Sequence, residues 1–238
     1  MKNKFARYIL IAIVLAPMVI FVAKFGEPSI LKTYVRAGMA HSQNLAIFSL
    51  EPEPENYNLS VDETFLNKLK RYRLPQMDIL LPKNIKAVEG ETSITYYKKK
   101  PGRSYKPIAY LLYEKPGFFM DLFPHLKKQG ITNDHDFLSR TMAAKIDDIK
   151  TVTDAFFVIM KGVFTPDMEE QKNLKMIKFS CDGKDGFISY NMDGKTNYFD
   201  CNFFDRAGNF FKVYIKDPSA SLDLNKICTI ISTAKKNK

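Results

Sequence analysis

The residue types that bind metal ions come together once in the sequence, in the run Asn-Asp-His-Asp that ends at Asp136. Carboxylates and imidazole are common metal ligands. A helix is expected to begin here, however, and adjacent helical residues point in different directions, so Asp134, His135 and Asp136 cannot readily close around one ion. Asn133 is instead a good N-cap. We therefore predict a helix start here, and we assign no metal and no cofactor.

Residues for nucleophilic catalysis show no recognisable spacing. The histidines, His41, His125 and His135, lie in separate segments with no serine or cysteine motif beside them. The run Gly194-Lys195-Thr196 has the end of a phosphate-binding loop, but the glycine required five positions earlier is Ser189. An exported hydrolase-type enzyme stays an alternative, because catalytic groups can be assembled from distant parts of a chain.

The segment from Lys98 to Lys106 is strongly basic. Its positive charges cannot pack internally, so we expect an exposed hairpin tip. Such a tip suits an anionic partner, although a solvated loop is the commoner outcome. The charged residues are Lys98, Lys99, Lys100, Arg103 and Lys106.

Two further pairs of residues are candidates for a ligand or partner surface. Phe118 and Phe119 are expected in the core; if exposed, they would mark a hydrophobic contact site or a loop that dips into a membrane. Tyr198 and Asp200 belong to a predicted sheet face that mixes aromatic and hydrogen-bonding side chains. That face suits a polar ligand, although a solvated face with aromatic cross-strand pairs is the commoner outcome.

A sheet must position the second pair. Four runs typical of strands follow one another between Leu174 and Lys216, separated by turn signals. Asp193-Gly194 is the signature of a two-residue type I′ hairpin, which would place Tyr190 opposite Asn197. Alternation then gathers one apolar face, and the apolar residues from Leu222 to Ile231 predict a C-terminal helix that covers it. The predicted face consists of Ile177, Phe179, Cys181, Ile188, Tyr190, Phe199, Cys201, Phe203, Phe211, Val213 and Ile215.

The remaining elements complete an α+β fold. Ser60 and Glu63 form a capping-box pattern that predicts a helix to about Arg73. Thr151 and Asp154 could cap a further apolar run that reads as a helix or a strand, with helix favoured. Strands are expected at residues 77–82, 84–88, 92–97 and 107–113, a helical stripe at 30–39, and a helix end at Gly130.

The chain contains three cysteines, Cys181, Cys201 and Cys228. Their odd number and spacing argue against a disulfide framework and against a zinc site, so buried thiols are favoured. Cys181 and Cys201 are predicted on one face but two strands apart, roughly 9 to 10 Å at ~4.8 Å per strand, which is too far for a bridge. A bridge from Cys228 to one of them is the minor alternative.

The uncharged run from Tyr8 to Ala23 predicts a membrane anchor. At ~1.5 Å per residue it spans about 24 Å, and the stems of Arg7 and Lys24 extend it toward the thickness of a bilayer. A cleaved signal peptide is the alternative, but cutting after Ala23 would place bulky Phe21 at the third position upstream. We expect the N-terminus in the cytoplasm and the bulk of the chain outside it, periplasmic in a Gram-negative source.

Composition indicates a globular chain, with 45% hydrophobic residues, 19 phenylalanines and no tryptophan. The net charge is +10, of which Lys2, Lys4, Arg7 and Lys24 contribute four positive charges to the anchor region. The remaining +6 suits anionic lipid or an acidic partner of the cell envelope better than nucleic acid, because no nucleic-acid module is recognisable.

The predicted organisation has three parts. Residues 1–25 form an N-terminal transmembrane helix (or signal peptide), residues 26–56 a helical neck with an acidic Pro-Glu linker, and residues 57–238 an exported α+β domain. The domain is expected to have an antiparallel sheet, with a C-terminal four-strand meander, covered by helices. The predicted function is a binding or assembly module of the envelope; a cleaved soluble carrier of an apolar small molecule is a further alternative to the enzyme.

Overall fold

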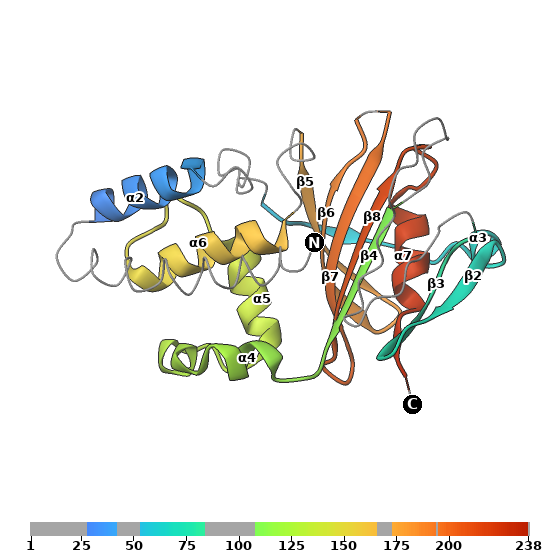
Figure 1. Cartoon of the computed structure of the whole chain (residues 1–238), viewed down its shortest axis with the longest axis horizontal. Helices are drawn as coiled ribbons and strands as arrows, with labels where there is room; N and C mark the ends of the chain where they lie inside the picture. Colours follow the sequence, from blue (N-terminus) through green and yellow to red (C-terminus); the bar gives the residue numbers. More distant parts are fainter. Residues whose placement is uncertain (1–27, 42–52, 84–107, 166–172, 194, 238) are drawn as a thin grey trace. The chain divides into compact units, whose positions relative to one another are not determined.

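A computed structural model of the chain describes residues 28–41, 53–83, 108–165, 173–193 and 195–237 (Figure 1). The fold is α+β, as the sequence predicts, and it divides into two compact units. The helical unit comprises Met1–Pro52 and Leu138–Lys172, and the sheet unit comprises Glu53–Phe137 and Asn173–Lys238. Within the described ranges no helix is long and apolar enough to cross a membrane; the predicted anchor at Tyr8–Ala23 lies outside them.

The helical unit is built on α2 (Pro28–His41) and α6 (Val152–Phe164). Thr151 and Asp154 form the expected capping box, since each side chain accepts the backbone N–H of the other residue at 3.1 and 2.9 Å. The following apolar run is therefore a helix, which confirms the favoured alternative. A small core joins these helices, formed by Leu31, Val35, Ile149, Ala155, Val158 and Ile159.

A six-stranded mixed sheet dominates the sheet unit, in the order β1-β5-β6-β7-β8-β4. Strand β1 runs parallel to β5, and every other neighbouring pair is antiparallel. The strands are β1 (Glu55–Asn58), β4 (Ile108–Glu114), β5 (Lys175–Cys181), β6 (Lys184–Asn191), β7 (Asn197–Asp205) and β8 (Phe210–Asp217). The predicted meander is confirmed as β5 to β8.

The register of the β6–β7 hairpin differs from the prediction by two residues. Tyr190 pairs with Phe199 instead of Asn197, so the loop is longer than a two-residue turn. Because side chains alternate between faces with a period of two, a shift of two leaves every residue on its predicted face. The apolar face is accordingly as expected, with Ile188, Phe199 and Cys201 fully buried.

Helix α7 (Leu224–Ser232) and a second, three-stranded sheet cover that apolar face (Figure 1). The small sheet has the order β2-β3-β9, with β2 (Leu69–Arg73), β3 (Met77–Pro82) and β9 (Lys235–Lys236) all antiparallel. Strand β3 therefore does not join β4 in one sheet, and the predicted strands at 84–88 and 92–97 lie outside the described residues. The C-terminal helix is confirmed.

The predicted helix from Ser60 to Arg73 is wrong. Asp62 is the N-cap, accepting the backbone N–H of Thr64 and Phe65 at 3.0 Å each, and the helix α3 (Glu63–Leu66) has only 4 residues. The chain then turns into strand β2. The sequence Leu-Lys-Arg-Tyr-Arg fits both a helical stripe and strand alternation, and pairing with β3 decides for the strand.

A disulfide joins Cys181 at the end of β5 to Cys228 in α7, with the two Cα atoms 6.7 Å apart. The favoured prediction of free thiols is thus wrong for this pair. The spacing between strands could not predict this bridge, because the second cysteine lies on α7, which packs on the face of the sheet. Cys201 is free and buried, so the prediction that it does not bridge Cys181 is confirmed.

Helix α5 (Asp134–Ala143) begins where predicted, with the Asn133 side chain accepting the N–H of Asp136 at 2.9 Å. Asp134 is buried and accepts the backbone N–H groups of Gly117, Phe119 and Met120 at 2.7 to 3.1 Å. Its carboxylate thus holds the start of α4 (Phe118–Leu122), which the 3-10 helix η2 (Pro124–Gln129) follows. Gly130 ends η2 in the left-handed conformation, as expected.

Asp217 fixes the connection from β8 to α7. Its buried carboxylate accepts the backbone N–H groups of Ser219, Ser221 and Leu222 at 2.7 to 3.0 Å. Burial by itself raises the pKa of Asp217, but hydrogen bonds from Ser219, Leu222 and Ser221 outweigh it and lower the pKa below its ordinary value. Folding therefore favours the ionised form of the Asp217 carboxyl group.

We expect Asp217→Asn to destabilise the protein by about 2 to 3 kcal/mol at neutral pH, because an amide offers one acceptor oxygen where a carboxylate offers two. Because the pKa of Asp217 is lower in the folded state, the ionised carboxylate stabilises the fold at pH values above its unfolded-state pKa of about 3.9. This stabilisation is lost as the pH falls toward the folded-state pKa. Urea denaturation at several pH values should therefore show the two proteins converging in acid. A constant difference down to the lowest pH would contradict this role.

Candidate functional site: a basic sheet face

The small sheet gathers positive charge on its outer face. In its register Arg73 pairs with Asp78, and Asp78 pairs with Lys235 on the other side. Arg71 pairs with Leu80, two residues along the same strand, so its side chain shares this face. We call Arg71, Arg73, Asp78 and Lys235 the basic face.

Asp78 is the counter-ion at the centre of the basic face, with only 4% of its surface exposed. Arg71 donates to Oδ2 through Nε, at 3.1 Å, and through Nη2, while Arg73 Nε lies 3.5 Å from Oδ1. The hydrogen bond from Arg71 lowers the pKa of Asp78 below its ordinary value against the effect of burial, and the charges of Arg71, Arg73 and Lys235 lower it further. The carboxylate therefore stays ionised and holds the guanidinium groups in place.

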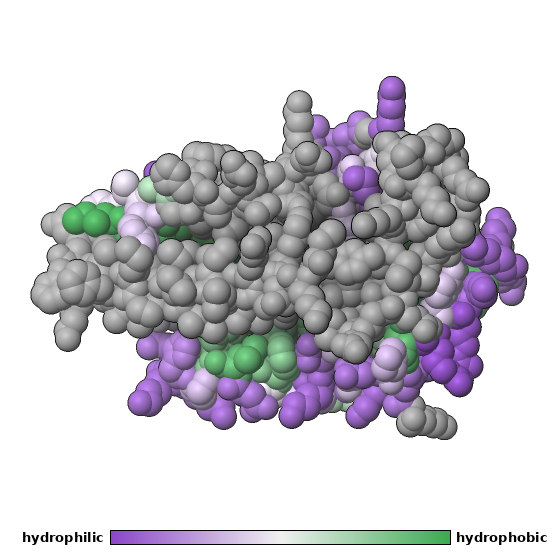
Figure 2. Space-filling view, viewed as in Figure 1, coloured by the Kyte–Doolittle hydropathy of each residue, from purple (hydrophilic) through white to green (hydrophobic). Residues whose placement is uncertain are grey.

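The cations themselves remain accessible to a partner. The side chain of Arg71 is 51% exposed and that of Arg73 is 72% exposed, and Lys235 is exposed as well. One buried carboxylate faces three cations, so the face carries excess positive charge. Lys70 and Lys236 are exposed too, but they pair with Leu81 and Met77, so alternation places them on the opposite face of the small sheet. Figure 2 shows a hydrophilic surface over β2 and β3, at the right of the view.

The structure does not bring together those predicted site residues that it describes. The basic hairpin tip, with Lys98, Lys99, Lys100, Arg103 and Lys106, lies outside the described residues. Phe118 is half-buried, whereas Phe119 is in the core, stacked on Phe137 with ring centroids 4.9 Å apart. Tyr198 is half-buried, with Lys216 Nζ 4.9 Å from the centre of its ring.

Asp200 lies in a buried polar cluster on the sheet face opposite the main core. Its Oδ2 lies 3.0 Å from Lys212 Nζ, and its Oδ1 accepts from Asn202 Nδ2 at 3.0 Å. The side chains of Asp200 and Lys212 are 3% and 13% exposed, and Ser189 on the neighbouring strand is fully buried. The expectation that this part of the face is solvated is therefore wrong.

Burial raises the pKa of Asp200, more than the charge of Lys212 and the hydrogen bonds of Lys212 and Asn202 lower it. An aspartate that water cannot reach depends on its partner for charge compensation. The cluster is consequently a buried ion pair between Asp200 and Lys212, with Asn202 as a further partner of the carboxylate.

Among the described residues, a histidine meets a carboxylate where His135 Nε2 lies 3.3 Å from Asp185 Oδ2. Both side chains are nearly half exposed, at 43% and 49%, so water surrounds the pair. An enzyme site would be expected to enclose its acid and base in a concave pocket. His125 lies exposed on η2, beside the ring of Phe123.

Comparison with family models, curated proteins and solved structures finds no match. Across the part of the chain that the structure describes, no group of three or more histidine, cysteine, aspartate or glutamate side chains is placed to hold a metal ion.

The sequence shows the charged residues of the basic face but does not indicate that they lie together. The sequence predicts Lys70, Arg71 and Arg73 within the helix that runs to about Arg73, and Lys235 and Lys236 follow the predicted C-terminal helix. The alternation in residues 69–73 was the available signal, since it places Arg71 and Arg73 on one side of a strand. Arg71 and Arg73 lie near Lys235 because β3 pairs with both β2 and β9, a pairing that the sequence does not indicate.

Proposed function

We propose that this protein is a membrane-anchored, extracytoplasmic binding module whose basic face docks against anionic phospholipid head groups. The observation that carries the proposal is the exposure of Arg71, Arg73 and Lys235 on one face around a single buried carboxylate. Each such charge near an anionic membrane surface contributes about 1 kcal/mol of binding free energy. Several of them on one rigid sheet give a useful affinity without a deep pocket.

The location outside the cytoplasm is part of the same proposal. The run from Tyr8 to Ala23 supports an anchor by its length and its flanking charges. The bridge between Cys181 and Cys228 supports an oxidising compartment independently, because disulfides persist in exported proteins and are rare in the cytosol.

The test uses the full chain in neutral nanodiscs, so that the N-terminal segment is already occupied by lipid. Flotation with separate phosphatidylglycerol vesicles should show binding that weakens as salt is added, and neutral phosphatidylcholine vesicles should not bind. Replacing Arg71, Arg73 and Lys235 by glutamine should weaken binding about ten- to hundredfold, because the head groups lose their counter-charges. Because this variant also leaves Asp78 buried without its counter-charges, circular dichroism must show it folded before its binding is compared.

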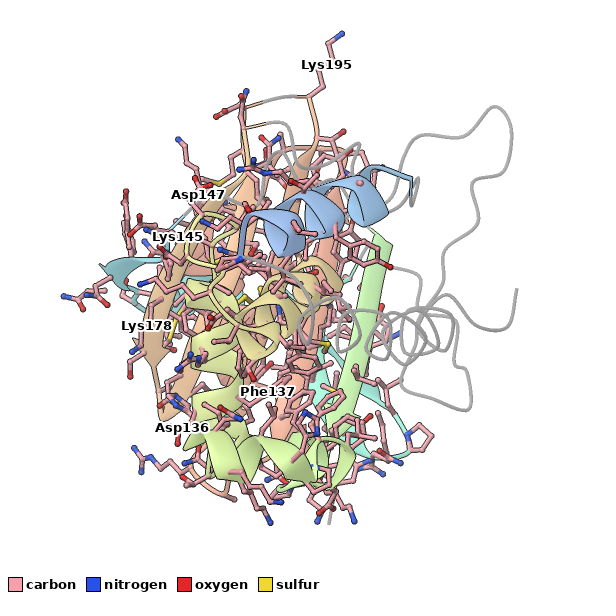
Figure 3. The ribbon with its side chains drawn as sticks, turned by 90° about the vertical axis from the view of Figure 1, so that its left-hand side faces the viewer. Asp136, Phe137, Lys145, Asp147, Lys178 and Lys195 are labelled. Atoms are coloured by element: carbon pink, nitrogen blue, oxygen red, sulfur yellow. A yellow bond between two sulfur atoms is a disulfide. The ribbon has the colours of Figure 1, made fainter. Side chains whose placement is uncertain are left out.

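A matched control removes three exposed cations from β5 and from the loop between β6 and β7, by Lys175→Gln, Lys178→Gln and Lys195→Gln. Lys178 and Lys195 both point outward in Figure 3. This variant has the same net charge as the basic-face variant and should bind nearly as well as the unmodified chain. Equal losses in the two variants would reduce the effect to net charge and would refute a specific role for the basic face.

A further inference from the structure

An apolar surface with basic flanks lies at another part of the sheet unit, on α4 and η2. Leu122, at the end of α4, is 44% exposed, and Phe118 and Phe123 beside it are half-buried. We call these three residues the apolar ridge. Figure 2 shows an apolar patch over α4 at the lower edge of the view.

The ridge is rigid, because its inner side is held in the core. Phe119 packs against Phe137 and Phe210 with ring centroids 4.9 and 5.0 Å apart, and Phe123 stacks on Phe137 at 5.7 Å. The Asp134 carboxylate fixes the first backbone amides of α4. Leu122 is therefore exposed by the fold itself and cannot turn inward without unpacking these rings.

The flanks of the ridge are positively charged. Lys115 precedes α4, and Lys127 and Lys128 lie on η2; all three are exposed. Asp121 is the one acidic residue between Lys115 and Gly130. Apolar side chains flanked by lysines are the pattern of segments that lie in the interface of an anionic membrane, with the apolar groups among the acyl chains and the amines among the head groups.

We propose that the apolar ridge enters the lipid interface while Lys115, Lys127 and Lys128 contact anionic head groups. The inference rests on the proposed function, since it supplies the lipid-inserting part of the same docking event. Charge complementarity with an anionic bilayer favours lipid over an acidic protein, because an acidic protein offers no reason for Leu122 to be exposed between the lysines. The ridge adds binding that salt does not remove.

The absence of tryptophan from the chain makes a direct test possible. Leu122→Trp introduces the single tryptophan on the ridge, which is excited selectively over the tyrosines, and Tyr57→Trp introduces one at a 48% exposed position on β1 as the control. The full chain in neutral nanodiscs is mixed with saturating phosphatidylglycerol vesicles that carry brominated acyl chains. Fluorescence of the Leu122→Trp variant should be quenched by the bromines and protected from acrylamide, while that of the Tyr57→Trp variant should show the reverse.

A second variant covers the case in which tryptophan itself perturbs the ridge. Leu122→Ser should leave low-salt flotation largely intact and reduce high-salt flotation roughly fivefold, because a partly exposed leucine is lost from the lipid contact. Two results would overturn the inference. One is acrylamide quenching of the Leu122→Trp variant as strong as that of the Tyr57→Trp variant, and the other is high-salt flotation of Leu122→Ser equal to that of the unmodified chain.

Failure of this inference is distinguishable from failure of the proposed function. If bromines do not quench the Leu122→Trp variant while the basic-face variant still loses flotation, the ridge does not insert and the basic face stands. If the basic-face variant floats like the unmodified chain, the proposed function fails whatever the ridge fluorophore reports.

Discussion

Replacing Lys212 with methionine is expected to destabilise the protein by about 3 to 5 kcal/mol, because it leaves the carboxylate of Asp200 buried without its counter-charge. Methionine matches the length of the lysine stem, so the loss is one of charge and not of packing. Asp200 is almost inaccessible to water, and Asn202 alone cannot compensate its charge. The pKa of Asp200, which burial already raises, should rise further in this variant.

A double-mutant cycle measures this coupling. Asp200→Asn combined with Lys212→Met removes both charges and should recover most of the loss, since a neutral buried pair carries no large desolvation cost. Lys178→Met, on the exposed side of β5, is the control and should change stability by less than about 0.5 kcal/mol. The measurement is urea denaturation of the full chain in mild detergent. A double variant destabilised by the sum of the losses of Asp200→Asn alone and Lys212→Met alone would show that the pair is not coupled.

Removing the bridge between Cys181 and Cys228 is the other change with a large expected effect. The bond closes a loop with a sequence separation of 47 residues. On the loop-entropy model a closed loop of this length stabilises the fold by about 4 kcal/mol. Cys181→Ser with Cys228→Ser should therefore lower the melting temperature strongly, and a reducing agent should do the same to the unmodified chain.

Thiol titration and the variant Cys201→Ala show whether a fall in melting temperature comes from loss of the bridge. The unmodified chain, denatured without reductant, should titrate as one thiol, because Cys201 is the free cysteine. Cys201→Ala removes a buried thiol without touching the bridge, and its melting temperature should still fall when reductant is added. Three titratable thiols in the protein isolated under non-reducing conditions would contradict the bridge, and with it one support for the oxidising compartment.

Local sequence signals predicted the helix starts and the strand faces, because these features depend on interactions between residues that are close in the sequence. The Asn133 cap and the Thr151–Asp154 capping box are interactions within one helical turn. The faces of β5 to β8 follow from alternation alone, which is why the wrong partner of Tyr190 did no harm to the prediction of the core.

The errors concern contacts between segments that are distant in the sequence. Residues 69–73 fit a helix and a strand equally well until β3 pairs with them. Cys228 meets Cys181 only because α7 crosses the sheet at one place. The basic face depends on three strands from two distant parts of the chain, and no pattern within any one of them indicates that Arg73 and Lys235 flank the same carboxylate.

The β6–β7 hairpin also has a consequence for protein engineering. A strand pair whose faces survive a register change of two should accept the insertion of two residues at the loop between Asn191 and Asn197. A one-residue insertion that slides β7 along β6 would exchange Phe199 and Cys201 for Asp200 and Asn202 in the main core. An inserted segment that does shift this register should therefore contain an even number of residues.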